Sequence, residues 1–87
     1  MGALETSAVE RAVTAFIVDN FLFGNAAEAP APTASFMDTG LIDSTGILEL
    51  VGFVESTYQI KVGDDELVPE HLDSVANLAA FVVRKAG

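Results

Sequence analysis

The sequence predicts an all-α protein: a four-helix bundle with three main helices, a short third helix and a long loop between helices one and two. Apolar residues recur at helical spacing within residues 7–22, 44–58 and 75–82. A proline-containing segment separates the first two of these stretches. The 87 residues, 51% of them hydrophobic, suit one small domain over residues 1–87. We therefore expect an up-and-down bundle, modified by the long loop, whose apolar stripes meet in a single core.

The first predicted helix covers residues 7–22. Ser7 and Glu10 have the spacing of a capping box, in which two side chains satisfy two backbone N–H groups at the helix start. Gly24 follows as a stop signal. The residues expected to face the core are Val9, Val13, Phe16, Ile17 and Phe21. We expect this helix to have a structural role.

The next stretch, residues 24–40, is predicted to be a loop. It contains Pro30 and Pro32 and has little apolar surface to bury. Near its end come four apolar residues that we expect to fasten it to the bundle: Phe36, Met37, Leu41 and Ile42. The loop is therefore interpreted as a connection within one domain.

The second helix is predicted to begin at Ser44 or Thr45 and to end near Tyr58. Both Asp43 and Ser44 are good N-cap residues, and either could accept a hydrogen bond from the first turn. The apolar stripe consists of Ile47, Leu48, Leu50, Val51, Val54 and Tyr58. The simplest interpretation of the Asp-Ser pair is therefore a helix cap.

The last third of the chain predicts a short helical turn and a final helix. Asp64, Asp65 and Glu66 favour the turn, and Pro69 is expected to end or redirect it. The final helix follows a second Asp-Ser pair, Asp73-Ser74, either member of which could cap it. Its stripe is Val75, Leu78, Ala79 and Val82, and it closes with Arg84 and Lys85, which suit a helix C-terminus.

The charge of the chain is strongly negative. Thirteen acidic residues stand against four Lys and Arg residues, for a formal charge of −9. Such a chain is repelled by nucleic acid and by anionic lipid, so the partner we expect is a protein with a basic surface. No apolar run is long enough to span a bilayer, and residues 1–24 lack the pattern of a signal peptide. With no cysteine, the chain is expected to be cytoplasmic.

A family resemblance begins at Asp43-Ser44, followed by Ile47, Leu48, Glu49, Leu50 and Val51. This segment resembles the attachment segment of acyl and peptidyl carrier proteins, and the similarity continues over nearly the whole chain, including residues 60–67. The resemblance implies the four-helix bundle of acyl carrier proteins. It also implies a covalent cofactor, 4'-phosphopantetheine on Ser44, whose thiol holds an acyl or aminoacyl group as a thioester.

The resemblance further implies a carrier that is not itself an enzyme and is a monomer. Its partners would be a phosphopantetheinyl transferase and an adenylating ligase, acyltransferase or synthase with a basic docking surface, in fatty acid, polyketide or nonribosomal peptide biosynthesis. Asp43, Glu49 and Glu55 match acidic partner-contact positions of the family. Thr45 departs from the common Asp-Ser-Leu, and the approach Gly40-Leu41-Ile42-Asp43-Ser44 is similar to that of stand-alone carriers such as D-alanyl carrier proteins.

Two glycines within the second helix suggest a close approach to its backbone. Gly46 and Gly52 each cost about 1 kcal/mol relative to alanine inside a helix. Another helix could pack against them, or the prosthetic arm could pass over them. The sequence leaves these two explanations open.

Other functions remain as alternatives. In the first, the chain is an acidic helical adaptor without a prosthetic group, and Asp43-Ser44 only caps a helix. In the second, Ser44, His71 and an aspartate form a hydrolase site, but the chain lacks a nucleophile elbow. The acidic run at residues 64–66 lacks the spacing of a calcium loop, so no metal is predicted. Ser44 is preferred to Ser74 chiefly because of the family resemblance, and the helix that follows Ser74 also carries no acid.

Overall fold

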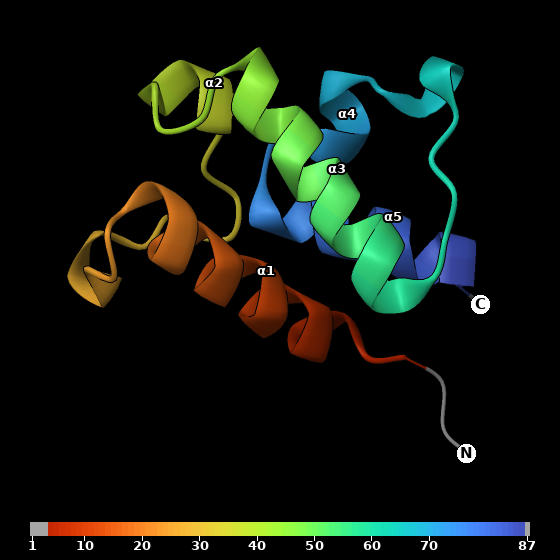
Figure 1. Cartoon of the computed structure of the whole chain (residues 1–87), viewed down its shortest axis with the longest axis horizontal. Helices are drawn as coiled ribbons and strands as arrows, with labels where there is room; N and C mark the ends of the chain where they lie inside the picture. Colours follow the sequence, from red (N-terminus) through yellow and green to blue (C-terminus); the bar gives the residue numbers. More distant parts are fainter. Residues whose placement is uncertain (1–3, 87) are drawn as a thin grey trace.

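Three long helices form the body of the protein in a computed structural model that describes residues 4–86 (Figure 1). They are α1 (Thr6–Phe21), α3 (Ser44–Tyr58) and α5 (Val75–Ala86). The connections contain two four-residue helices, α2 (Phe36–Thr39) and α4 (Pro69–Leu72), and two 3₁₀ helices, η1 (Ala26–Glu28) and η2 (Asp64–Glu66). The predicted all-helical bundle is confirmed, and α3 starts and ends where the sequence indicates. The described residues form five α-helices, three long and two short, where the sequence predicts three long helices and one short one.

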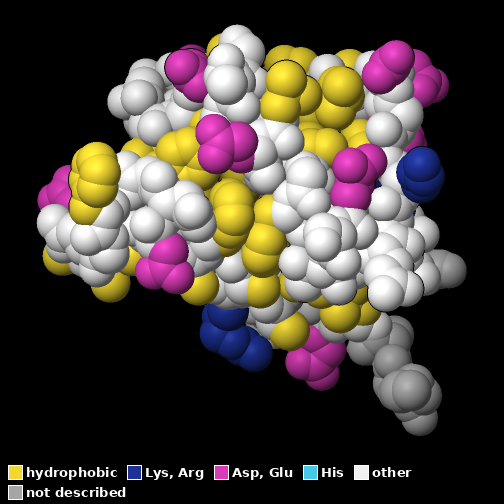
Figure 2. Space-filling model, in the orientation of Figure 1, with side chains coloured by type: hydrophobic (Ala, Val, Ile, Leu, Met, Phe, Trp, Pro, Cys, Tyr) yellow, Lys and Arg dark blue, Asp and Glu magenta, His cyan; other side chains and the backbone are white. Residues whose placement is uncertain are grey.

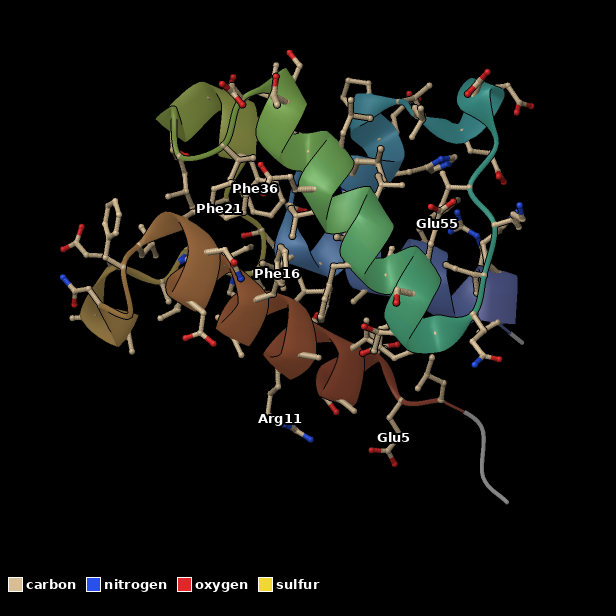
Figure 3. The ribbon with its side chains drawn as sticks, viewed as in Figure 1. Glu5, Arg11, Phe16, Phe21, Phe36 and Glu55 are labelled. Carbon is tan, nitrogen blue, oxygen red and sulfur yellow. The ribbon has the colours of Figure 1, made fainter. Side chains whose placement is uncertain are left out.

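The core lies where the three long helices meet. Its centre consists of fully buried aliphatic and aromatic side chains from each of them, among them Val9, Val13, Ile17, Leu50, Val54, Val75, Leu78, Phe81 and Val82. Between α1 and α3, the ring of Phe16 stacks on Phe53 with a centroid separation of 4.4 Å and meets Phe21 edge to face at 6.3 Å. Figure 3 shows Phe16 and Phe21 directed into the space between these helices. The predicted stripe of α1 therefore faces the core, with Phe16 and Phe21 at its partly buried edge.

The start of α1 differs from the prediction. The helix begins at Thr6, one residue earlier than expected, and Glu5 is its N-cap without a side-chain hydrogen bond. The expected capping box of Ser7 and Glu10 is therefore wrong, because Ser7 lies within the first turn instead of preceding it. At the other end, Gly24 adopts a left-handed conformation and its N–H donates to the Val18 carbonyl at 2.8 Å, which fits the predicted stop.

The long connection after α1 is more ordered than its prolines suggest. The side chain of Ser35 accepts a hydrogen bond from Asp38 N–H and caps α2, and Gly40 closes that helix with a φ of 73°. Phe36 and Ile42 are fully buried and Leu41 is partly buried, so they fasten the connection as predicted. Met37 does not, since 52% of it is exposed.

The connection from α3 to α5 also contains two short helices in place of one. The side chain of Glu66 accepts a hydrogen bond from Gly63 N–H at 2.9 Å, which caps the start of η2. Pro69 begins α4 instead of ending a helix, because its fixed φ and missing N–H suit the first helical position. Finally, Ser74 Oγ accepts from Asn77 N–H at 3.1 Å and caps α5, which decides between the two caps that the sequence allows. Within residues 4–86, no helix has the length and apolar character needed to cross a bilayer.

Candidate functional site

The first turn of α3 presents Ser44 to solvent. Asp43 is the N-cap, and its Oδ1 accepts a hydrogen bond from Gly46 N–H at 2.9 Å. This bond decides between the two possible caps, so Ser44 becomes the first helical residue and its side chain is exposed. Backbone N–H groups and the positive end of the helix dipole point outward at this position. The helix start therefore favours a negatively charged substituent on Ser44 over the same group in the middle of a helix.

An apolar hollow opens beside Ser44. It has a volume of about 250 Å³. Its lining residues come from α2, α3 and the segment leading into and through α4: Met37, Ser44, Ile47, Leu48, Leu67, Val68, Pro69, Leu72 and Asp73. Figure 2 shows apolar side chains at the surface between the start of α3 and α4. Leu48 and Met37, each more than half exposed, belong to this hollow, so the exposed serine hydroxyl lies next to an open apolar surface.

The second Asp-Ser pair is in a different environment. Ser74 is only 5% exposed, and its hydroxyl oxygen is engaged in capping α5. A modifying enzyme could not reach this hydroxyl without opening the junction of α4 and α5. Ser44 and Ser74 therefore differ in solvent accessibility, which their similar local sequences do not reveal.

The two glycines of α3 have different surroundings. A Cβ at Gly46 would lie 2.5 Å from Ile42 Cγ2 and 2.9 Å from Phe21 Cε1, so this glycine permits close packing against α1 and the preceding loop. Apart from its chain neighbours and the adjacent backbone of α3, no atom lies within 4 Å of the corresponding position at Gly52. Packing thus explains Gly46, and no contact within the described chain explains Gly52.

The acids predicted as partner contacts differ in exposure and in their hydrogen bonds within the chain. Glu49 is exposed on α3. Glu55 is half-buried, and its Oε2 accepts a hydrogen bond from Val62 N–H at 2.9 Å. Figure 3 shows Glu55 on the side of α3 that faces this connection. Asp43 is exposed but also caps α3. Glu49 is therefore the acid of the three whose position suits docking without a structural role.

The acidic run at residues 64–66 is tied to the end of α5. Glu66 pairs with Lys85 at 2.9 Å, and the pKa of its carboxyl lies below the ordinary value because Gly63 N–H and Lys85 stabilise the charged form. In residues 4–86, no group of three or more His, Cys, Asp or Glu side chains could hold a metal ion.

His71 does not join Ser44. Its ring stacks on Phe81 at 4.7 Å, and Nδ1 lies 3.1 Å from the carbonyl oxygen of Glu66. The residues that line the hollow at Ser44 do not include it. The arrangement needed for the hydrolase alternative is therefore not brought together here.

One interaction beside the hollow was not predicted. The carboxylate of Asp73 accepts hydrogen bonds from the Ser35 hydroxyl and from Met37 N–H. The sequence indicates only that Asp73 could cap the final helix. Since its partners lie 38 and 36 positions earlier in the chain, no local pattern could have identified them.

Comparison with protein-family models and with curated proteins finds no match for this chain.

Proposed function

We propose that this chain is a stand-alone carrier domain of the acyl carrier type, whose helical bundle has the arrangement of that class and whose Ser44 bears 4'-phosphopantetheine. The observation that carries the proposal is the exposed hydroxyl of Ser44 at the start of α3, on the rim of the apolar hollow. It is joined by the resemblance of residues 43–51 to a carrier attachment segment. When attached, the group supplies a thiol that holds an acyl or aminoacyl cargo as a thioester.

The residues around Ser44 fit this role. Ser44 offers the oxygen for a phosphodiester, and the first-turn N–H groups favour the negative charge that such an ester places there. Asp43 fixes the first turn through its bond to Gly46 N–H, so the hydroxyl is held at a defined exposed position. The hollow gives the apolar part of an arm or cargo a surface on which to rest. No base beside Ser44 is needed, because a separate transferase activates the reaction.

The charge of the chain supports partners with basic surfaces. At a net charge of −9, with Glu49 exposed on α3, the domain attracts positively charged enzyme surfaces and accelerates their association. Salt should weaken such encounters. Fast, salt-sensitive association suits a cytoplasmic carrier that visits a transferase, a ligase or acyltransferase, and a consuming enzyme in turn.

Intact-mass measurement after incubation with coenzyme A and a phosphopantetheinyl transferase of broad specificity tests the proposal. We expect the wild-type chain to gain the mass of one phosphopantetheinyl group. Ser44→Ala should abolish the gain. The control variant Ser56→Ala removes another exposed serine of the same helix and should retain the gain, because Ser44 is still present.

Two results would count against the proposal. If the wild-type chain gains no mass, the acidic adaptor without a prosthetic group is favoured. If Ser44→Ala is still modified while a folded Ser74→Ala variant is not, the attachment residue has been wrongly assigned.

A further inference from the structure

Met37 forms one wall of the apolar hollow but lies on a helix that cannot stand alone. The helix α2 has only four residues, and an isolated helix of that length is unstable in water. The other walls belong to the fifteen-residue helix α3 and to the segment at residues 67–73. The position of Met37 relative to Leu72 across the hollow therefore depends on what fastens α2 to the rest of the protein.

Asp73 supplies that fastening together with the burial of Phe36. Its carboxylate accepts from Ser35 Oγ and, through Oδ1, from Met37 N–H at 3.0 Å. Its backbone carbonyl accepts from Phe36 N–H at 2.8 Å. We name these three hydrogen bonds from residues 35–37 to Asp73 the α2 clasp. One residue at the junction of α4 and α5 thus holds the cap of α2 and its first two residues.

Asp73 also lines the hollow itself. The clasp therefore sets the separation of the two walls that carry Met37 and Leu72, while α3 forms the wall that carries Ser44. A hydrogen bond to a carboxylate is stronger than one between neutral groups, so the side-chain part of the clasp is the part that holds Met37 in place.

We infer that Asp73 is a positioning residue for the cargo of the carrier: it holds α2 against α4 and so keeps the hollow beside Ser44 shaped for an apolar chain. This inference rests on the proposed function. Without the carboxylate, only the backbone bond from Phe36 N–H to Asp73 and the burial of Phe36 still hold α2. Met37 is then less firmly held, and an apolar cargo on Ser44 is less well sheltered from water.

Amide hydrogen exchange on the unmodified protein tests the clasp itself. In Asp73→Ala, the amides of Met37 and Asp38 should exchange about tenfold faster or more, while those of Leu50 and Val54 in α3 change much less. Ser35→Ala removes one bond of the clasp and also the acceptor of Asp38 N–H, so Asp38 should accelerate in this variant too. Met37 N–H keeps its bond to Asp73 and should accelerate less than in Asp73→Ala. Glu70→Ala removes an exposed acid from α4 and should leave both groups of amides unchanged.

Thioester hydrolysis on the modified protein tests the effect on cargo. With a hexanoyl group, Asp73→Ala should hydrolyse several-fold faster than wild type, and with an acetyl group the two should match because acetyl is too short to use the hollow. Glu70→Ala should behave as wild type with both groups. An equal acceleration for both groups, or none, would overturn the inference.

The two measurements separate the possible failures. If wild-type Ser44 takes up no phosphopantetheine, the proposed function fails, and the exchange experiment still decides whether Asp73 holds α2. If α2 and α3 amides accelerate together in both Asp73→Ala and Ser35→Ala, Asp73 has only a general structural role and the positioning role is wrong.

Discussion

The carboxylate of Glu55 accepts a hydrogen bond from the backbone N–H of Val62, 2.9 Å away and seven residues later in the chain. This bond fastens the connection that follows α3 to the helix itself. The family resemblance predicts a docking role for Glu55, yet its carboxylate already has a partner within the chain. Glu49 and Glu55 therefore carry the same charge on the same helix but have different surroundings.

We expect Glu55→Ala to lower the free energy of unfolding by about 1–3 kcal/mol, because it leaves the partly buried Val62 N–H without an acceptor. The matched variant Glu49→Ala should change it by less than about 0.5 kcal/mol, since Glu49 is exposed. Urea denaturation measures both. Equal effects of the two variants would show that the bond contributes nothing to stability.

Gly46→Ala and Gly52→Ala should have opposite signs. At Gly46 the new methyl group meets Ile42 and Phe21, and we expect a loss of about 1–3 kcal/mol from overpacking. At Gly52 the space is open, so alanine should stabilise the helix by up to about 1 kcal/mol. Thermal and urea unfolding of the two variants provide the measurement, and a stabilising Gly46→Ala would contradict the packing seen between α1 and α3.

The two serines of the Asp-Ser pairs should differ in their effect on folding. Ser74→Ala removes the cap of α5 and should cost about 1 kcal/mol, measured by urea unfolding. Ser44→Ala should shift stability by less than about 0.5 kcal/mol, because this hydroxyl is exposed and Asp43 supplies the cap of α3. A large loss in Ser44→Ala would mean that its hydroxyl has a structural role.

Glu66 should contribute to the acid sensitivity of the fold. The pKa of its carboxyl in the folded protein lies below the ordinary value of 4.5, first because of Gly63 N–H and then because of Lys85. A group with a depressed folded pKa adds stability that is fully present above its unfolded pKa and is lost as the pH falls through its folded pKa. In Glu66→Gln, the melting temperature should therefore fall less steeply than in wild type as the pH drops below about 4.5.

Two further variants test how much of this acid sensitivity comes from the ion pair with Lys85 and how much from the loss of one negative charge. Lys85→Met removes the ion pair and keeps the bond from Gly63 N–H, so its curve should lie between those of wild type and Glu66→Gln. Glu70→Gln controls for the loss of one negative charge from the neighbouring α4. If Glu66→Gln follows the wild-type slope through the whole acid range, the assigned hydrogen bonds do not hold the carboxylate in its charged form.

The residues that depend on local physics were predictable. The stripes at Val9, Val13 and Ile17 and at Leu50 and Val54 follow from helical spacing, and they are buried as expected. The start of α3 was predictable to within one residue, because both Asp43 and Ser44 are good caps, and the structure selects Asp43. The short helices α2 and α4 were missed, because four-residue helices have no periodic stripe and are held by contacts with distant residues.

The candidate site was predictable only in part. The sequence by itself placed Asp43 and Ser44 at a helix start, because capping and apolar spacing act over a few neighbouring residues. Only the tertiary structure decided that Ser44 faces solvent while Ser74 is buried, that Gly46 packs against Phe21, and that Asp73 binds Ser35. These relationships join positions about 25 to 40 residues apart. Burial and hydrogen bonding between such positions arise when the helices pack together, so they are a property of the assembled core.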